Sequence, residues 1–107
     1  MIYELRIYET VPGKLPDLHK RFDTITLKIW DRLGIKQAGF WVDDVGTSNK
    51  LTYLIAWESM AEREEKWGIF QADPEWNEKR AQTEAAGPIV ARVINSFLRP
   101  TPYSSVK

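Results

Sequence analysis

The stretch "LTYLIAWESMAE", residues 51–62, contains the change of pattern that decides the fold of this chain. Its first seven residues are apolar at nearly every position, which is typical of a strand with apolar side chains on both faces. Ser59 then stands three residues before Glu62, the spacing of a capping box at a helix start. The stretch therefore predicts a strand over 51–57 followed directly by a helix that runs to about residue 70.

Downstream of this helix, the segment "DPEW" at residues 73–76 restarts the helical pattern. Asp73 suits the N-cap position, and Pro74 suits the first helical position, where its missing N–H has no bond to make. The stop signal "AGP" at residues 86–88 ends this piece, and a strand follows over 88–98. The second helix of the fold is therefore predicted in two parts.

Two tryptophans flank the break between these helical pieces. Trp67 lies seven residues after Met60 and three before Phe70, so the three side chains are predicted to share the sheet-facing side. Trp76 falls in the first turn of the next piece and is expected to hold the corner in place. We interpret both tryptophans as structural.

Upstream of residue 51, the pattern changes from strand alternation to a helical stripe. Residues 2–10 alternate as a strand, and the "PG" at 12–13 ends it. The helix that follows ends at Gly34, and a second strand is predicted at 36–44 with Gly39 as a bulge. The apolar residues of the helix recur every three or four positions and form one stripe: Leu15, Leu18, Phe22, Ile25, Ile29 and Leu33.

The predicted order is β-α-β-β-α-β, an α+β chain with the ferredoxin-like antiparallel sheet and helices on one face. Residues 1–99 form this domain, and residues 100–107 are a C-terminal tail. Because helices on one face leave the other open, apolar side chains on both faces of the strands predict a homodimer through the open sheet face. Each large apolar side chain left in water would forfeit roughly 1.5–3 kcal/mol. Aspartate at Ile55 or Ile94 is expected to break the dimer if these side chains face it.

The composition excludes several classes of protein. Of the 107 residues, 43% are hydrophobic and 28% are charged, as in a soluble globular protein. Fifteen basic residues balance fifteen acidic ones, so no net field favours nucleic acid. The absence of cysteine excludes disulfides, thiol catalysis and cysteine-ligated metals. The start of the chain has no signal-peptide pattern and no apolar stretch is long enough for a membrane span, so we expect a cytoplasmic location.

Polar residues share one face of the first strand, which is central in the ferredoxin-like order. Glu4, Arg6 and Tyr8 must therefore be paired or face a cavity. One interpretation is a structural ion-pair network in which Arg92 or Glu58 is the partner. The other is a polar pocket floor that holds a carboxylate or carbonyl ligand.

A pocket for a small apolar or aromatic ligand is expected between the helices and the sheet. His19, the only histidine, and Arg6 are the candidate catalytic residues. One histidine and no cysteine predict no metal site, and no motif requires a cofactor. Nucleophile elbows, phosphate loops and dinucleotide fingerprints are absent from the sequence. The candidate ligand-binding residues are Arg6, Tyr8, Trp41, Tyr53 and Trp57.

Three segments together resemble the NIPSNAP family: "YELRIYETVPGKLPDLHKRF" at 3–22, "AWESMAEREEKWGIFQADPEW" at 56–76 and "NSFLRPTPYS" at 95–104. The resemblance covers nearly the whole chain and implies a dimeric α/β-barrel. As a compact single domain, the chain is similar to the short bacterial members of this family, which are largely uncharacterised. The family has no agreed catalytic set, so the resemblance assigns no functional residue.

Three hypotheses about function follow from the residues and the resemblance. The first is a NIPSNAP-like homodimer with a small-molecule pocket between sheet and helices. The second, by analogy with other proteins on the same barrel, is a small monooxygenase or isomerase, either cofactor-independent or haem-using. The third is a structural protein-interaction module. The residues leave open whether the protein is an enzyme.

Overall fold

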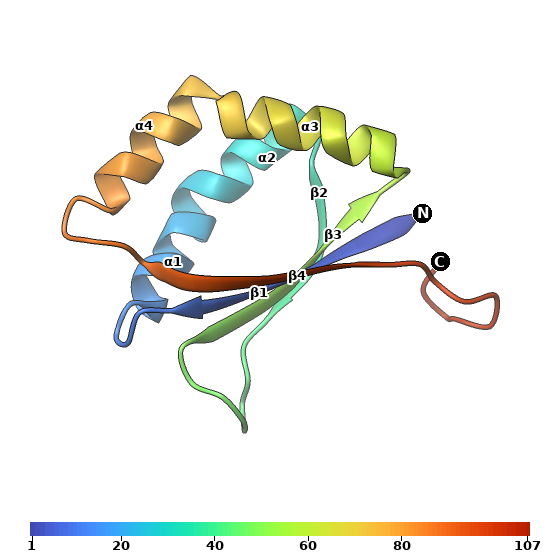
Figure 1. The fold of residues 1–107 in the computed structure, drawn as a ribbon, viewed down its shortest axis with the longest axis horizontal. Coiled ribbons are helices and arrows are strands. Elements are labelled where there is room, and N and C mark those ends of the chain that lie inside the picture. The colour runs from blue at the N-terminus through green and yellow to red at the C-terminus, as the bar shows by residue number, and fades with distance from the viewer.

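A computed structural model describes residues 1–107 as one four-stranded antiparallel sheet with all helices on one face (Figure 1). The sheet order is β2-β3-β1-β4, so the first and third strands are central, as the ferredoxin-like plan requires. The elements are β1 (Ile2–Thr10), α1 (Leu15–Arg21), η1 (Phe22–Thr26), α2 (Leu27–Leu33), β2 (Lys36–Trp41), β3 (Lys50–Trp57), α3 (Met60–Ala72), α4 (Pro74–Thr83) and β4 (Val90–Leu98).

The local signals for helix ends and bulges are confirmed. The Ser59 hydroxyl accepts a hydrogen bond from the Glu62 amide at 3.2 Å, and the Asp73 carboxylate accepts one from the Trp76 amide at 2.9 Å. Gly34 ends α2 with φ +76°, a left-handed conformation that favours glycine. Gly39 lies where the pairing of β2 with β3 shifts register, as the bulge prediction required.

Two strand boundaries differ from the prediction. Strand β2 ends at Trp41, so the expected residues 42–44 belong to the loop before β3. Strand β4 begins at Val90, two residues after the predicted start.

The first helix contains a π-helical turn that the periodicity did not predict. In η1 the Leu27 amide donates to the Phe22 carbonyl, five residues back, so this turn holds one residue more than an α-helical turn. One extra residue rotates the following helix by about 100°. As a result Thr26 and Trp30 are buried, while Ile25 of the predicted stripe is only partly buried.

The strand register decides which residues face the helices. Arg6 pairs with Tyr53 on one side and Asn95 on the other, and all three lie on the helix-facing side of the sheet. Ile55 pairs with Glu4 on that same side and is fully buried. Ile55 therefore does not meet the condition set for the dimer test, because its register places it in the core and not on the open face. Ile94 pairs with Ile7 on the opposite, open face.

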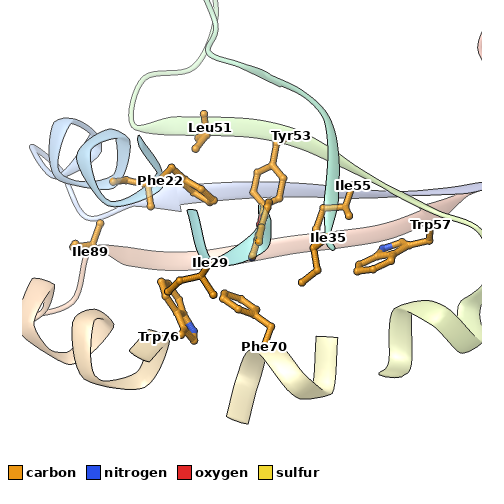
Figure 2. Close-up of a cluster of buried hydrophobic side chains, with 12 residues drawn as sticks. Phe22, Ile29, Ile35, Leu51, Tyr53, Ile55, Trp57, Phe70, Trp76 and Ile89 are labelled. Carbon is orange, nitrogen blue, oxygen red and sulfur yellow. The ribbon is translucent and has the colours of Figure 1, made fainter. Parts of the chain in front are cut away.

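The core fills the space between the sheet and the helices (Figure 2). Trp57 lies at one end of this cluster, well apart from Phe22 and Trp76. The Trp76 ring packs 4.8 Å from the Phe70 ring centre and is buried, which confirms that it holds the α3–α4 corner. Met60 is 42% exposed, so the prediction that it shares the buried side with Phe70 is wrong.

The other face of the sheet carries no helix (Figure 1). Its central strands present apolar side chains there, and the edge strand β4 adds more. These residues are Leu5, Ile7, Leu54, Ile94 and Leu98. No helix of the protein has the length and apolar content needed to cross a bilayer.

Candidate functional site

A buried carboxylate lies at the centre of the polar groups on the helix-facing side of β1. Glu4 has no solvent exposure, and its two oxygens accept hydrogen bonds from four side chains. Asn95 donates at 2.8 Å, the Trp57 indole at 3.0 Å, Arg6 at 3.0 Å, and Arg63 at 3.1 and 3.2 Å. We call these five residues the Glu4 cluster.

Electrostatics favours the charged form of every ionisable group in the Glu4 cluster. Burial alone raises the pKa of Glu4, but hydrogen bonds from Arg63, Asn95 and Trp57 and the charge of Arg6 lower it more. The net result is a Glu4 pKa below its ordinary value. Burial lowers the pKa of Arg6, and the nearby Tyr53 and Tyr8 oxygens and the Glu4 carboxylate more than offset it, so its pKa is raised. Two guanidinium groups share this one buried carboxylate, and Arg63 has a second partner in the exposed Glu64 at 3.1 Å.

Arg6 connects the Glu4 cluster to two tyrosine hydroxyls. Its Nε donates to the Tyr53 oxygen at 2.7 Å, and a terminal nitrogen donates to the Tyr8 oxygen at 3.3 Å. The two hydroxyls also hydrogen-bond to each other at 2.9 Å. Burial raises the pKa of Tyr53 well above its ordinary value, so its hydroxyl keeps its proton. The guanidinium carbon stacks 4.7 Å from the Trp67 ring centre, a cation–π contact that holds Arg6 flat.

A cavity of about 400 Å³ adjoins Arg6 and Tyr8 between the sheet and the helices. This volume is in the range of sites that hold small organic molecules. Nearly half of its lining residues are polar or charged; Arg6, Arg21, Arg80 and Glu84 are among them, while the side chain of Arg92 pairs with Glu9 on the open face of the sheet. The residues that line it are Arg6, Tyr8, Arg21, Phe22, Thr26, Trp30, Trp67, Phe70, Gln71, Trp76, Arg80, Glu84, Pro88, Val90, Ala91, Arg92 and Val93.

Two polar atoms close behind the cavity wall have no partner within the protein. Thr26 and Trp30 line the cavity with other atoms, while the Thr26 hydroxyl and the Trp30 indole N–H are fully buried and unpaired. A buried donor without a partner costs about 1–3 kcal/mol. The π-helical turn η1 brings both residues to this wall, because without its extra residue the following turn would face elsewhere.

Basic residues from the helices line the far side of the cavity. Arg21 is buried, donates to the Glu84 carboxylate at 3.2 Å and lies 5.6 Å from the Trp76 ring centre. Arg80 approaches the same Glu84 at 3.8 Å. One carboxylate therefore serves two guanidinium groups here too, and this side of the cavity is also positively charged.

A second, more open hollow of about 350 Å³ lies elsewhere, between the first helix and strand β2. His19 and Trp41 line it together with Asp23 and Phe40. His19 is exposed on α1 and does not line the larger cavity.

Only some of the ligand-binding residues expected from sequence lie at the cavity. Arg6 and Tyr8 line the cavity, and the Tyr53 hydroxyl lies directly behind them through its bonds to both. Trp57 is buried against Glu4 at the other end of the core, and Trp41 lies on the open face of β2, 52% exposed.

The expectation that Arg92 or Glu58 is the ion-pair partner of Glu4 and Arg6 is wrong. Arg92 pairs with Glu9 on the open face of the sheet, at 3.5 Å. Glu58 makes no ion pair, and its backbone amide donates to Glu62. Arg63 and Asn95 take the expected places beside Glu4, because the strand register and the direction of α3 bring them there.

Sequence reasoning missed the helix-side residues of the cavity. Thr26, Trp30, Arg21 and Arg80 gave no local signal, since their facing depends on the π-helical turn and on how α4 packs. No group of three or more histidine, aspartate or glutamate side chains that could hold a metal ion is present.

Comparison with known proteins identifies relatives of the chain. The sequence model of the NIPSNAP family matches residues 3–105. A NIPSNAP-like domain protein from Burkholderia xenovorans is 26% identical, with a TM-score of 0.85 over 96% of this chain and 87% of that one. A NIPSNAP family protein from Agrobacterium tumefaciens is 23% identical, with a TM-score of 0.88 over 99% and 98% of the two chains. The Burkholderia protein is described as uncharacterised, and no curated protein matches the chain.

Proposed function

This chain belongs to the NIPSNAP family, and from that membership and the geometry of its cavity we propose that it is a homodimeric small-molecule-binding protein. The ligand occupies the cavity between the sheet and α3–α4. The observation that carries this proposal is a cavity of about 400 Å³ that is lined by Arg6, Tyr8 and a group of aromatic side chains. A cavity of this size with a few polar groups in an apolar wall is typical of small-molecule sites.

The homodimer rests on the open face of the sheet. Ile7 and Ile94 pair across β1 and β4 there, with Leu5 and Leu54 beside them, and no helix covers these side chains. A second copy of the chain packed through a two-fold axis buries this face on both subunits at once. The cytoplasmic location remains the prediction made from sequence.

The two candidate catalytic residues do not share one site. Arg6 lines the cavity, and His19 lies in the second hollow.

Native mass spectrometry on protein taken from its own host, with no added ligand, tests the proposal. We expect twice the chain mass plus a reproducible extra mass. Ala91→Trp adds a large side chain to the cavity lining and should remove the extra mass, while Ala81→Trp adds it to the exposed surface of α4 and should not. A wild-type dimer without extra mass, or an extra mass that survives in Ala91→Trp, would contradict binding in this cavity.

The same experiment tests the dimer. Ile94→Asp places a charge on the open sheet face and should give the single chain mass. Ile69→Asp is the matched control, because Ile69 is 50% exposed on α3, on the helix side of the molecule. A dimer that persists in Ile94→Asp would show that this face is not the interface.

A further inference from the structure

We propose that the ligand of this cavity is a small monocarboxylic acid with an aromatic or other apolar body. This inference rests on the proposed function and adds the chemical class of the ligand. It follows from an imbalance between hydrogen-bond donors and acceptors in the cavity wall.

The first unused donors belong to Arg6. A guanidinium has five N–H groups, and those of Arg6 make three hydrogen bonds, to Tyr53, Glu4 and Tyr8. Two N–H groups therefore have no partner in the protein. Because Arg6 lines the cavity and its ring contacts hold it flat, these groups are presented in a fixed plane. A carboxylate matches that planar geometry better than a single oxygen does.

Tyr8 contributes a further donor. The Tyr8 oxygen accepts from Arg6, and the two tyrosine hydroxyls share one hydrogen bond in which Tyr53 donates. Tyr53 is fully buried while Tyr8 lines the cavity. The Tyr8 hydroxyl hydrogen is thus left without an acceptor in the protein and is available at the cavity.

The helix wall adds no donor to the site. The Trp30 indole N–H and the Thr26 hydroxyl are unpaired, but both atoms are enclosed behind the lining, where a ligand does not reach them. The unused hydrogen-bonding groups at the cavity are therefore the donors of Arg6 and Tyr8, and a ligand end made only of acceptor atoms pairs with them.

The charge of the site specifies an anion. In the Glu4 cluster Arg6 shares the Glu4 carboxylate with Arg63, and only Arg63 has a second partner, the exposed Glu64. On the far side Arg21 and Arg80 share Glu84. A monoanion at Arg6 gives this guanidinium a counterion of its own, in a place where Arg6 is only 12% exposed and solvent screening is weak.

The rest of the cavity wall suits an apolar body. Phe22, Trp30, Trp67, Phe70 and Trp76 line it, and neighbouring rings among them lie 4.8–6.1 Å apart. Figure 2 shows Phe22, Phe70 and Trp76 on the helix side of the core. Such a wall stabilises an aromatic or aliphatic group through burial and ring contacts. The acid is held by its carboxylate at Arg6 and by its body at the tryptophans.

Isothermal titration calorimetry with matched pairs of probes tests the proposal. The probes are 3-phenylpropionate and octanoate, each paired with its primary amide, and phenyl phosphate as a second anion. We expect each acid to bind at least about tenfold more tightly than its amide, as charge-assisted hydrogen bonds predict. We also expect Ala91→Trp to abolish binding of the acids. That result assigns the binding site of the acids to the cavity.

Tyr8→Phe keeps the ring and removes the hydroxyl hydrogen that has no acceptor in the protein, so it should weaken acid binding several-fold. Tyr3→Phe is the control, since the Tyr3 hydroxyl donates to the Lys107 carbonyl and lies outside the cavity. Arg6→Lys keeps the charge, loses the planar pair of donors and should reduce the preference for acid over amide.

The outcomes distinguish the two proposals. Equal binding of acids and amides would overturn the carboxylate assignment and leave small-molecule binding intact. Tighter binding of phenyl phosphate than of either acid would also overturn it, in favour of a phosphate ester. Absence of binding by every probe overturns the carboxylate assignment, and an extra mass in the native spectrum would then still support a different ligand.

Discussion

Glu4 is the residue whose replacement should destabilise this protein most for the smallest change in shape. In Glu4→Gln the side chain keeps its size, loses its charge, and gains an NH₂ group where donors already point. Arg6 and Arg63 then face each other without the carboxylate that separates them, and the Trp57 indole or Asn95 loses an acceptor. Of the side chains that donate hydrogen bonds to Glu4, all except Asn95 are largely buried.

The magnitude follows from this burial. Removing one partner of a buried ion pair costs about 3–5 kcal/mol. The lower end applies, because Arg63 also pairs with the exposed Glu64 and so keeps one counterion. For a domain of this size, about 3 kcal/mol corresponds to a drop of at least about 12 °C in the thermal midpoint.

The effect should depend on pH in a definite direction. The pKa of Glu4 is lowered from 4.5 in the folded protein, so the folded state binds its proton less readily than the unfolded chain. The stabilisation by Glu4 is therefore fully present above pH 4.5 and is lost as the pH falls through the folded pKa. The difference in thermal midpoint between wild type and Glu4→Gln should be largest near neutral pH and should shrink below pH 4.5.

Thermal unfolding followed by circular dichroism at several pH values measures this difference. The matched control is Glu64→Gln, which removes another carboxylate bonded to Arg63 but at a surface position, where ion pairs contribute at most about 1 kcal/mol. Equal midpoints for Glu4→Gln and Glu64→Gln at pH 7 would refute the reasoning. So would a Glu4→Gln effect that stays constant down to the acid limit of folding.

Two further predictions concern the ends of helices. Gly34→Ala should lower the free energy of unfolding by about 1 kcal/mol, because Gly34 has φ +76°, a conformation that disfavours alanine. The control Gly68→Ala, inside α3, should raise the free energy of unfolding by about 0.5–1 kcal/mol. Chemical denaturation measures both changes. Asp73→Ala should lower the thermal midpoint by several degrees, because the Asp73 carboxylate caps α4 and pairs with Arg32. Asp73→Asn, which keeps an acceptor for the Trp76 amide, should recover part of that loss, and an asparagine variant as unstable as the alanine one would argue against the cap.

Much of the fold was predictable because its signals are local. A capping box needs only Ser59 and Glu62, a left-handed helix end needs only Gly34, and a bulge in β2 needs only Gly39. Each of these residues acts on backbone groups within a few positions of itself. The order of strands and helices followed from these signals and from the two hydrophobic periods.

The candidate site was predictable only where it depends on strand alternation. Arg6 and Tyr8 share a face of β1 by spacing alone, and they line the cavity. Trp41 and Trp57 do not join them, because the bulge in β2 turns Trp41 to the open face and the length of β3 carries Trp57 to the far end of the core. Alternation gives the face of a residue within one strand and does not give its distance from residues on another.

The sequence by itself determined the elements, their caps and the family to which the chain belongs. Only the tertiary structure decided the partners of Glu4, which are 53, 59 and 91 residues away along the chain for Trp57, Arg63 and Asn95. It also decided that Thr26 and Trp30 are buried at the cavity wall, through a π-helical turn that adds one residue. The physical reason is that a side-chain hydrogen bond requires atoms within about 3 Å of each other. Strand register and helix rotation set distances on that scale, and neither is specified by a pattern within one segment.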